Sequence, residues 1–292
     1  MGSKSDRGVP PPVPEPLPVS IVDAHTHLDA CGATDPADVS TVLDRASSVG
    51  VRAVVTVADD MESARWVVRA STWDNRVYAA VALHPTRTAT FSEADRAEIA
   101  VLAAQPRVVA VGETGLDYYW DYSPPAAQRD AFRWHIGLAK RLDKPLMIHD
   151  REAHDDILSI LDEEGAPERV VFHSFSGDRD MARRCVDAGY VLSFSGTITF
   201  RNARAVREAA RFVPAEHIQV ETDAPFLTPH PYRGRPNQPY GVAYTVRGLA
   251  ELRGVTISEL LSSIDATTER LFRLRGVTDV GRPGGPTAPV EA

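Results

Sequence analysis

The feature that most constrains the fold is a regular alternation between short apolar runs and longer helical stretches. Strands that alternate with helices in this way are typical of repeated βαβ units around a parallel sheet. The span from residue 19 to residue 275 is close to the roughly 250 residues of a (β/α)8 barrel. We therefore predict an α/β protein, a (β/α)8 TIM barrel, over residues 19–275. The eight Val- and Ile-rich runs are 19–24, 51–57, 77–83, 107–112, 144–149, 169–173, 190–195 and 217–222.

Helix start and stop signals fall between these runs, as the barrel requires. Asp35-Pro36 has the form of an N-cap followed by proline in the first helical position. Gly165 and Gly189 stand where the fifth and sixth helices should end. A long irregular segment, residues 228–239, follows the eighth run, and helical stretches then continue to residue 274.

The two ends of the chain have a different composition from its centre. Residues 8–18 are too rich in proline for a helix or a central strand, and the last residues are rich in Gly, Pro, Thr and Ala. We therefore predict a disordered or extended tail at residues 1–18 and another at residues 276–292.

The overall charge and the apolar pattern exclude several classes of protein. A formal net charge of −8 argues against a protein that coats nucleic acid by bulk electrostatics. No stretch approaches the roughly 18 consecutive apolar residues of a membrane span, and no secretory signal is visible. The 2 cysteines cannot form a disulfide framework, so a reducing cytoplasm is the expected location. The sequence does not determine the oligomeric state, and a monomer is the default expectation.

The first run ends in a His-x-His pattern. His25 and His27 are two residues apart in an extended segment, so both side chains point to the same face. Two such imidazoles can bind one metal ion, or they can simply be satisfied by local hydrogen bonds.

Four further runs also end in a potential metal ligand, which favours the metal interpretation. Active sites of TIM barrels are built at the carboxyl ends of the strands, where these side chains would converge. Mixed imidazole and carboxylate ligation suits a divalent metal ion. The four residues are Glu113, His149, His173 and Asp223.

These segments resemble the TatD family of metal-dependent hydrolases in the amidohydrolase superfamily. The resemblance covers essentially the whole predicted barrel, with the motifs in family order and every ligand position present. The matching segments are Asp-Ala-His-Thr-His-Leu-Asp (23–29), Gly-Glu-Thr-Gly-Leu-Asp-Tyr-Tyr (112–119), Ile-His-Asp-Arg-Glu-Ala (148–153), His-Ser-Phe-Ser-Gly (173–177), Glu-Thr-Asp-Ala-Pro-Phe-Leu (221–227) and Arg-Gly-Arg-Pro-Asn-Gln-Pro (233–239).

The resemblance implies a centre with two divalent ions, which one carboxylate bridges. The sequence does not choose among Mg, Mn and Zn as the metal. Carried over position by position, one ion would be held by His25, His27, Glu113 and Asp223, and the other by Glu113, His149 and His173.

Five residues near the centre are candidates for the chemistry. We expect Asp223 to accept the proton of the attacking water, and the resemblance places His84 next to the scissile phosphate. Arg151 can pair with a phosphate, and Tyr119 belongs to an aromatic cluster on which bases could stack. Glu221 shares a face with Asp223, so it could contact substrate, orient Asp223 or be an ordinary salt-bridged residue. For Arg151 and Tyr119, the alternatives are a solvated charge and loop packing.

The leading hypothesis is a metal-dependent deoxyribonuclease that hydrolyses DNA phosphodiester bonds, trimming single strands or strand ends as an exonuclease. The nuclease activity is implied by the resemblance, because the residues themselves indicate only a binuclear hydrolase. One alternative keeps the metals but cleaves another ester or an amide. A non-catalytic scaffold is the second alternative, and the complete set of ligands argues against it.

Overall fold

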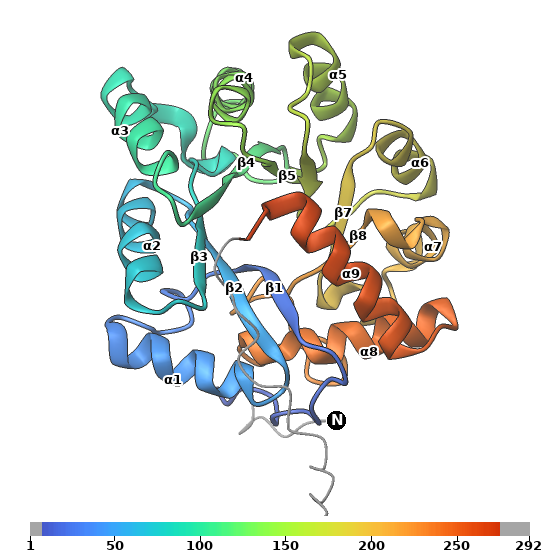
Figure 1. Ribbon diagram of the computed structural model, residues 1–292. Helices are drawn as coiled ribbons and strands as arrows, with labels where there is room; N and C mark the ends of the chain where they lie inside the picture. The colour runs from blue at the N-terminus through green and yellow to red at the C-terminus, as the bar shows by residue number, and fades with distance from the viewer. Residues whose placement is uncertain (1–7, 275–292) are drawn as a thin grey trace, which may run out of the picture.

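Eight parallel strands form the centre of the molecule, and each lies next to its neighbour in the chain (Figure 1). The computed structural model describes residues 8–274. A parallel bridge between Thr26 and Ala224 joins the first strand to the chain after the last one, which nearly closes the ring. The (β/α)8 prediction is thereby confirmed. The strands are β1 (Ile21–Thr26), β2 (Val51–Val57), β3 (Val77–Ala80), β4 (Val108–Asp117), β5 (Leu146–Arg151), β6 (Val170–Phe172), β7 (Val191–Phe194) and β8 (Ile218–Val220).

Helices surround the strands, and one helix lies across an end of the barrel (Figure 1). Within residues 8–274, no helix is both long enough and apolar enough to cross a membrane. The α-helices are α1 (Pro36–Ser47), α2 (Met61–Trp73), α3 (Glu93–Ala103), α4 (Pro125–Leu142), α5 (His154–Glu164), α6 (Arg179–Asp187), α7 (Arg204–Phe212), α8 (Val242–Arg253) and α9 (Ile257–Phe272); the 3-10 helices are η2 (Pro85–Thr90), η3 (Gly196–Thr199), η4 (Ala215–His217) and η5 (Pro239–Gly241).

The helix signals in the sequence act as predicted. The Asp35 carboxylate accepts hydrogen bonds from the backbone N–H groups of Ala37 and Asp38 at 2.8 and 3.0 Å, which caps the start of α1. Gly165 follows α5 with a φ of 68°, a left-handed conformation that glycine adopts without steric cost. The sequence signals therefore mark the first residue of α1 and the last residue of α5.

Two layers of apolar side chains hold the barrel together. The larger cluster packs the strands against the surrounding helices, and a second cluster fills the barrel interior. Leu271, Phe272 and Leu274, at the end of α9, belong to the interior cluster. Arg169 precedes β6 and donates a 2.9 Å hydrogen bond to the Leu271 carbonyl, which places this end of α9 at the amino ends of the strands. One end of the barrel is therefore closed by packing, and the carboxyl end carries the polar residues described below.

The N-terminal segment, for which the composition predicts a disordered or extended tail, is bonded to the rest of the chain. Residues 9–16 lie against α8 and the loop before it. Arg235 donates a 2.7 Å hydrogen bond to the Val9 carbonyl, and the Tyr240 hydroxyl donates a 2.6 Å bond to the Pro11 carbonyl. Proline lacks an N–H group but keeps its carbonyl, so a proline-rich segment can still accept such bonds. The tails predicted at residues 1–7 and 276–292 lie outside the described residues.

Candidate metal centre

The six predicted ligands converge at the carboxyl ends of five strands. His25 lies within β1, Glu113 within β4 and His149 within β5, while the other three follow their strands by one to three residues. All are buried except His149, which is partly buried. The six residues form one contiguous cluster through His25, His27, Glu113, His149, His173 and Asp223.

The Glu113 carboxylate stands at the middle of this cluster, with a different pair of imidazoles facing each oxygen. Its Oε1 lies 3.5 Å from His25 Nε2 and 3.7 Å from His27 Nε2. Its Oε2 lies 3.2 Å from His149 Nδ1 and 2.9 Å from His173 Nε2. The geometry therefore offers two adjacent positions for a cation, and Glu113 is shared between them.

Asp223 completes the first of these positions. Its Oδ1 lies 3.6 Å from His25 Nε2 and 3.4 Å from His27 Nε2, on the same nitrogens that face Glu113. The backbone of Asp223 has a φ of 52°, which is uncommon for a residue other than glycine and is often found at functional sites. Its N–H donates a 2.9 Å hydrogen bond to the His25 carbonyl, which holds the carboxylate beside β1.

Two glycines allow β4 to bring Glu113 this close to β5. A side chain at Gly112 would collide with Met147, and a Cβ at Gly115 would lie well inside 3.0 Å of the His149 carbonyl oxygen. The ladder pairs Gly115 with His149 directly. The run predicted at 107–112 is therefore too short. The strand continues to residue 117, so that Glu113 lies within it and not at its end.

Three of the imidazoles are oriented by a hydrogen-bond partner on their second ring nitrogen. Such partners fix the tautomer of a ligating histidine and raise its basicity, and they are usual around metal sites. A mixed set of imidazoles and carboxylates whose donor atoms lie within 4.8 Å of one another suits a divalent cation, so the residues present fit the implied ions. The pairs are His27 Nδ1 with the Val57 carbonyl at 3.0 Å, His149 Nε2 with Asp117 Oδ2 at 2.9 Å, and His173 Nδ1 with Glu221 Oε1 at 3.2 Å.

Glu221 contacts His173, so among the roles that the sequence leaves open for it the structure shows the ion-paired one. Its side chain is 1% exposed. Besides His173, its carboxylate accepts hydrogen bonds from the Ser174 N–H at 2.6 Å and from the Ser193 hydroxyl at 2.5 Å. With both oxygens engaged, Glu221 positions His173.

Two acidic residues at the centre were not assigned a role from the sequence. Asp117 bonds to His149, and Asp59 Oδ1 lies 3.8 Å from His27 Nδ1. Asp117 shares the face of Glu113 in an extended strand, four residues on, and Asp59 closely follows the second apolar run. Both positions could therefore have been predicted from the sequence. Asp117 required the correct end of β4, and Asp59 required the rule that polar residues at the carboxyl end of a strand face the site, applied to β2.

The electrostatics of the centre follow from burying acids among imidazoles. Burial alone would raise the pKa of Glu113, but the charges of His173 and His25 hold it well below its usual range. Burial would likewise lower the pKa of His27, yet the carboxylates around it, above all Asp223, raise it to about 10. Without a metal ion, the Glu113 carboxylate is therefore ionised and the His27 ring holds a proton at neutral pH.

His84 lies beside His149, one of the residues that face the second cation position. Its Nε2 is 3.3 Å from His149 Nδ1, and its Nδ1 is 2.7 Å from the Thr86 hydroxyl. Burial, with the nearby charge of His149, lowers the pKa of His84 to about 3. The ring is therefore neutral at neutral pH and can exchange hydrogen bonds without carrying charge.

Arg151 and Tyr119 lie together at the rim of the centre. The Arg151 guanidinium carbon is 3.9 Å from the centre of the Tyr119 ring, a cation–π contact. Both side chains are exposed, and Arg151 is two residues beyond His149 at the end of β5. Arg151 thus lies two residues from the predicted ligand His149, and Tyr119 lies beside Arg151.

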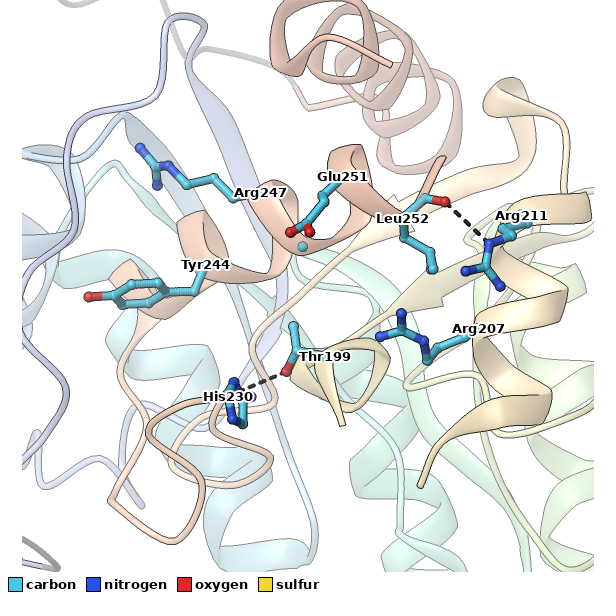
Figure 2. A pocket seen from close by; sticks show the side chains of 9 residues that line it. Thr199, Arg207, Arg211, His230, Tyr244, Arg247, Glu251 and Leu252 are labelled. Carbon is cyan, nitrogen blue, oxygen red and sulfur yellow. Dashed lines mark hydrogen bonds between the residues drawn. The ribbon is translucent and has the colours of Figure 1, made fainter. Parts of the chain in front are cut away.

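A separate cavity lies between α7 and α8, away from these ligands (Figure 2). Its volume is about 460 Å³, and none of the predicted site residues lines it. Arg207 and Arg211 extend into it from α7, but both donate hydrogen bonds to backbone carbonyls, of Ile198 at 3.0 Å and Leu252 at 3.3 Å. Arg207 therefore joins α7 to η3, and Arg211 joins α7 to α8.

Comparison with known proteins agrees with this geometry. The family model described as TatD related DNase matches residues 22–273. An uncharacterized metal-dependent hydrolase, TatD, from Mycobacterium tuberculosis is 61% identical over 237 residues, which cover 80% of this chain and 90% of the relative. The Bacillus subtilis hydrolase YabD, also uncharacterized, is 39% identical over 256 residues, covering 87% of this chain and 99% of the relative.

A solved structure shows the same fold. The crystal structure of YjjV, a TatD homolog from Escherichia coli, superposes with a TM-score of 0.80 at 31% sequence identity, and the match covers 87% of this chain and 98% of that one. The residues that the family model matches, 22–273, include the whole predicted metal centre and all of the barrel strands except the first residue of β1, Ile21. The chain therefore belongs to the TatD family of metal-dependent hydrolases.

Proposed function

We propose that this protein is a deoxyribonuclease that hydrolyses phosphodiester bonds at the ends of single-stranded DNA with two divalent ions. The observation that carries the proposal is the Glu113 carboxylate, whose two oxygens face two separate pairs of imidazoles. Paired cations suit an in-line displacement at phosphorus, in which both the attacking and the leaving oxygen carry negative charge. The name of the matching family model, TatD related DNase, supports DNA as the substrate.

The side chains described above would hold the two ions. One would lie among His25, His27, Glu113 and Asp223, and the other among Glu113, His149 and His173. When bound, divalent ions lower the pKa of water and stabilise charge on phosphate oxygens. Four neutral imidazoles and two carboxylates carry −2, so these six side chains with two divalent ions would together carry +2. The ions themselves would be the groups that attract a phosphate.

The remaining steps belong to the protein's own residues. The oxygen of water attacks phosphorus, and a carboxylate oxygen of Asp223 accepts the proton of the water. The bond from phosphorus to the leaving sugar oxygen breaks, and that oxygen takes up a proton from solvent to become a hydroxyl group, while Asp223 later returns its proton to solvent. Burial would raise the pKa of Asp223, but the hydrogen bond with His27 and nearby imidazole charges lower it, so the carboxylate is ionised and ready to accept. Neutral His84 can hydrogen-bond a phosphate oxygen beside the second ion.

The direct test is cleavage of end-labelled oligonucleotides. Purified protein would be incubated with a single strand labelled at its 5′ or 3′ end, in Mg²⁺ or Mn²⁺, with Glu113→Gln as the matched inactive variant. We expect stepwise shortening from one end by the wild type and none by the variant. Turnover of a carboxylic ester without any cleavage of DNA would instead favour the other hydrolase function.

Metal analysis tests the number of ions. We expect two divalent ions per chain after reconstitution and dialysis, and we expect Glu113→Gln to lose at least one. A wild-type ratio of one would contradict the paired mechanism. We also propose a cytoplasmic location, which the free thiols of Cys31 and Cys185 support because a reducing compartment keeps thiols free.

A further inference from the structure

The exposed Tyr, Trp and Phe side chains of residues 8–274 all lie on loops that follow β4 or β8, the strands nearest to Glu113 and Asp223 in the chain. Tyr119, Trp120 and Tyr122 belong to the loop after β4, and Phe226 belongs to the loop after β8. Their exposed fractions range from 42% for Trp120 to 63% for Tyr122. Large apolar side chains held in water are unfavourable unless something covers them, and a group of them at one place marks a binding surface.

The three rings after β4 form a compact group, which we call the aromatic ledge (Tyr119, Trp120 and Tyr122). Trp120 and Tyr122 stack with ring centres 5.4 Å apart and planes inclined by 11°. Tyr119 meets Trp120 edge to face at 4.8 Å. A flat ring added to such a stack extends it, so the ledge suits a planar heterocycle.

The ledge is connected to the metal centre through one carboxylate. Asp117 Oδ1 accepts hydrogen bonds from the N–H groups of Tyr119 and Trp120, both at 3.0 Å. Its Oδ2 is the partner of His149 at 2.9 Å. The Asp117 side chain therefore orients His149 and also holds the backbone of Tyr119 and Trp120, the first two residues of the ledge. These bonds fix the position of the ledge relative to His149.

A charge and a second aromatic surface complete the surroundings. The Arg151 guanidinium lies over Tyr119, where it gives the ledge a positive charge next to the β5 ligand His149. On the other side, the ring of Phe226 lies 6.1 Å from the ring of His27, the β1-side ligand. The two aromatic surfaces thus adjoin opposite halves of the centre, because His149 and His27 face different oxygens of Glu113.

We propose that the aromatic ledge and Phe226 bind the unpaired bases on either side of the scissile phosphate, and that they make the enzyme selective for single strands. This inference depends on the proposed nuclease function, which it deepens. Base stacking on aromatic side chains is tolerant of sequence, because every base has a π face. A base inside a duplex is already stacked and paired, so it cannot reach these rings without first being freed.

The test compares substrates that have the same phosphates but differ in their bases. One is a thymidine decamer, and the other is an abasic decamer with the same backbone. Trp120→Ala removes the central ring of the ledge, Trp120→Phe keeps a smaller one, and Val101→Ala changes an exposed apolar residue on α3. Circular dichroism would confirm that each variant is folded, and kcat/KM would be measured on both substrates.

We expect Trp120→Ala to lower kcat/KM on the thymidine decamer by about 5- to 150-fold, the range for one lost stacked base. On the abasic decamer it should match the wild type, and Trp120→Phe should recover most of the loss. Val101→Ala should behave as wild type on both. The preference of the wild type for a single strand over the same strand in a duplex should shrink in Trp120→Ala.

The outcomes separate this inference from the function on which it depends. If the wild type and Trp120→Ala cleave the thymidine decamer equally well, the ledge does not bind bases. The proposal of nuclease activity is unaffected by that result. An equal loss on both decamers would mean that Trp120 acts through the fold of the loop, which also overturns the inference. If the wild type cleaves neither decamer, the nuclease itself is refuted, and the ledge proposal with it.

Discussion

The contact between β4 and β5 is the most demanding in the metal centre, and Gly115→Ala tests it. Gly115 has a φ of 137°, in a region that residues with a side chain rarely adopt. An added Cβ would lie well inside 3.0 Å of the His149 carbonyl oxygen, and 3.1 and 3.2 Å from the backbone carbon and nitrogen of His149. The atoms that it meets are backbone atoms of a paired strand, so they cannot rotate away.

Two costs follow from this geometry. A strained backbone conformation costs about 1–3 kcal/mol, and overpacking a well-packed interior costs about another 1–3 kcal/mol. We therefore expect Gly115→Ala to lower the free energy of unfolding by about 2–6 kcal/mol. Because the clash forces β4 away from His149, it should also disturb the 3.2 Å approach of Glu113 to His149 and weaken metal binding.

The control is Gly189→Ala, which changes a glycine of positive φ, 81°, with no atom within 4 Å of the added Cβ. It carries only the backbone cost, about 1–2 kcal/mol. Urea unfolding in EDTA would give both free energies, and the gain on adding Mn²⁺ would report metal binding. If the two variants lose equal stability and gain equally from Mn²⁺, the close approach of β4 and β5 is not what builds the centre.

Three further predictions concern the base, the protonation of the centre and the N-terminal segment. Asp223→Asn should lower kcat/KM on DNA by about 10²- to 10⁴-fold with an unchanged circular dichroism spectrum, and near-normal turnover would exclude Asp223 as the base. The carboxylates of Asp223 and Asp59 outweigh the effect of burial and raise the pKa of His27 to about 10. The protonated His27 ring therefore stabilises the metal-free fold fully below pH 6.5, the ordinary pKa of histidine, and this stabilisation is lost as the pH rises through about 10. Urea unfolding in EDTA should therefore show stability falling as pH rises from 6.5 towards 10, and a rise in this window would contradict the assignment. Tyr240→Phe removes the hydroxyl that bonds Pro11 and should cost about 0.5–1.5 kcal/mol, with faster amide exchange near Val9 and Val13 than in wild type.

The convergence of the six predicted ligands could be predicted from the sequence because their position depends on topology. Each apolar run reads as a strand, and all strands of a parallel barrel point their carboxyl ends to the same side. Residues that stand at those ends, such as His173 after β6, must then converge whatever the details of packing. The capping signals add to this, since Asp35 and Gly165 mark helix ends by local hydrogen bonds and backbone conformation alone.

What the sequence did not predict depends on contacts between distant segments. The continuation of β4 through Gly115 lacks a strand-like composition, and its pairing with β5 decides its conformation. Without that extension, Asp117 is assigned to a loop and its bond to His149 is missed. Glu221 was correctly placed on an inward face, but its partner is His173, which lies 48 positions earlier in the chain.

The acidic residues at the centre explain why proton and metal binding should be coupled. Glu113 and Asp223 lie at the cluster itself, and Asp59, Asp117 and Glu221 flank its imidazoles. The buried carboxylates among them favour nearby positive charge, and they raise the pKa values of His27, His149 and His173 when no metal ion is bound. A divalent ion requires neutral imidazoles, so its binding must displace the protons that these rings hold. The same carboxylates that hold the protons would then hold the ions, and raising the pH should strengthen metal binding while it weakens the metal-free fold.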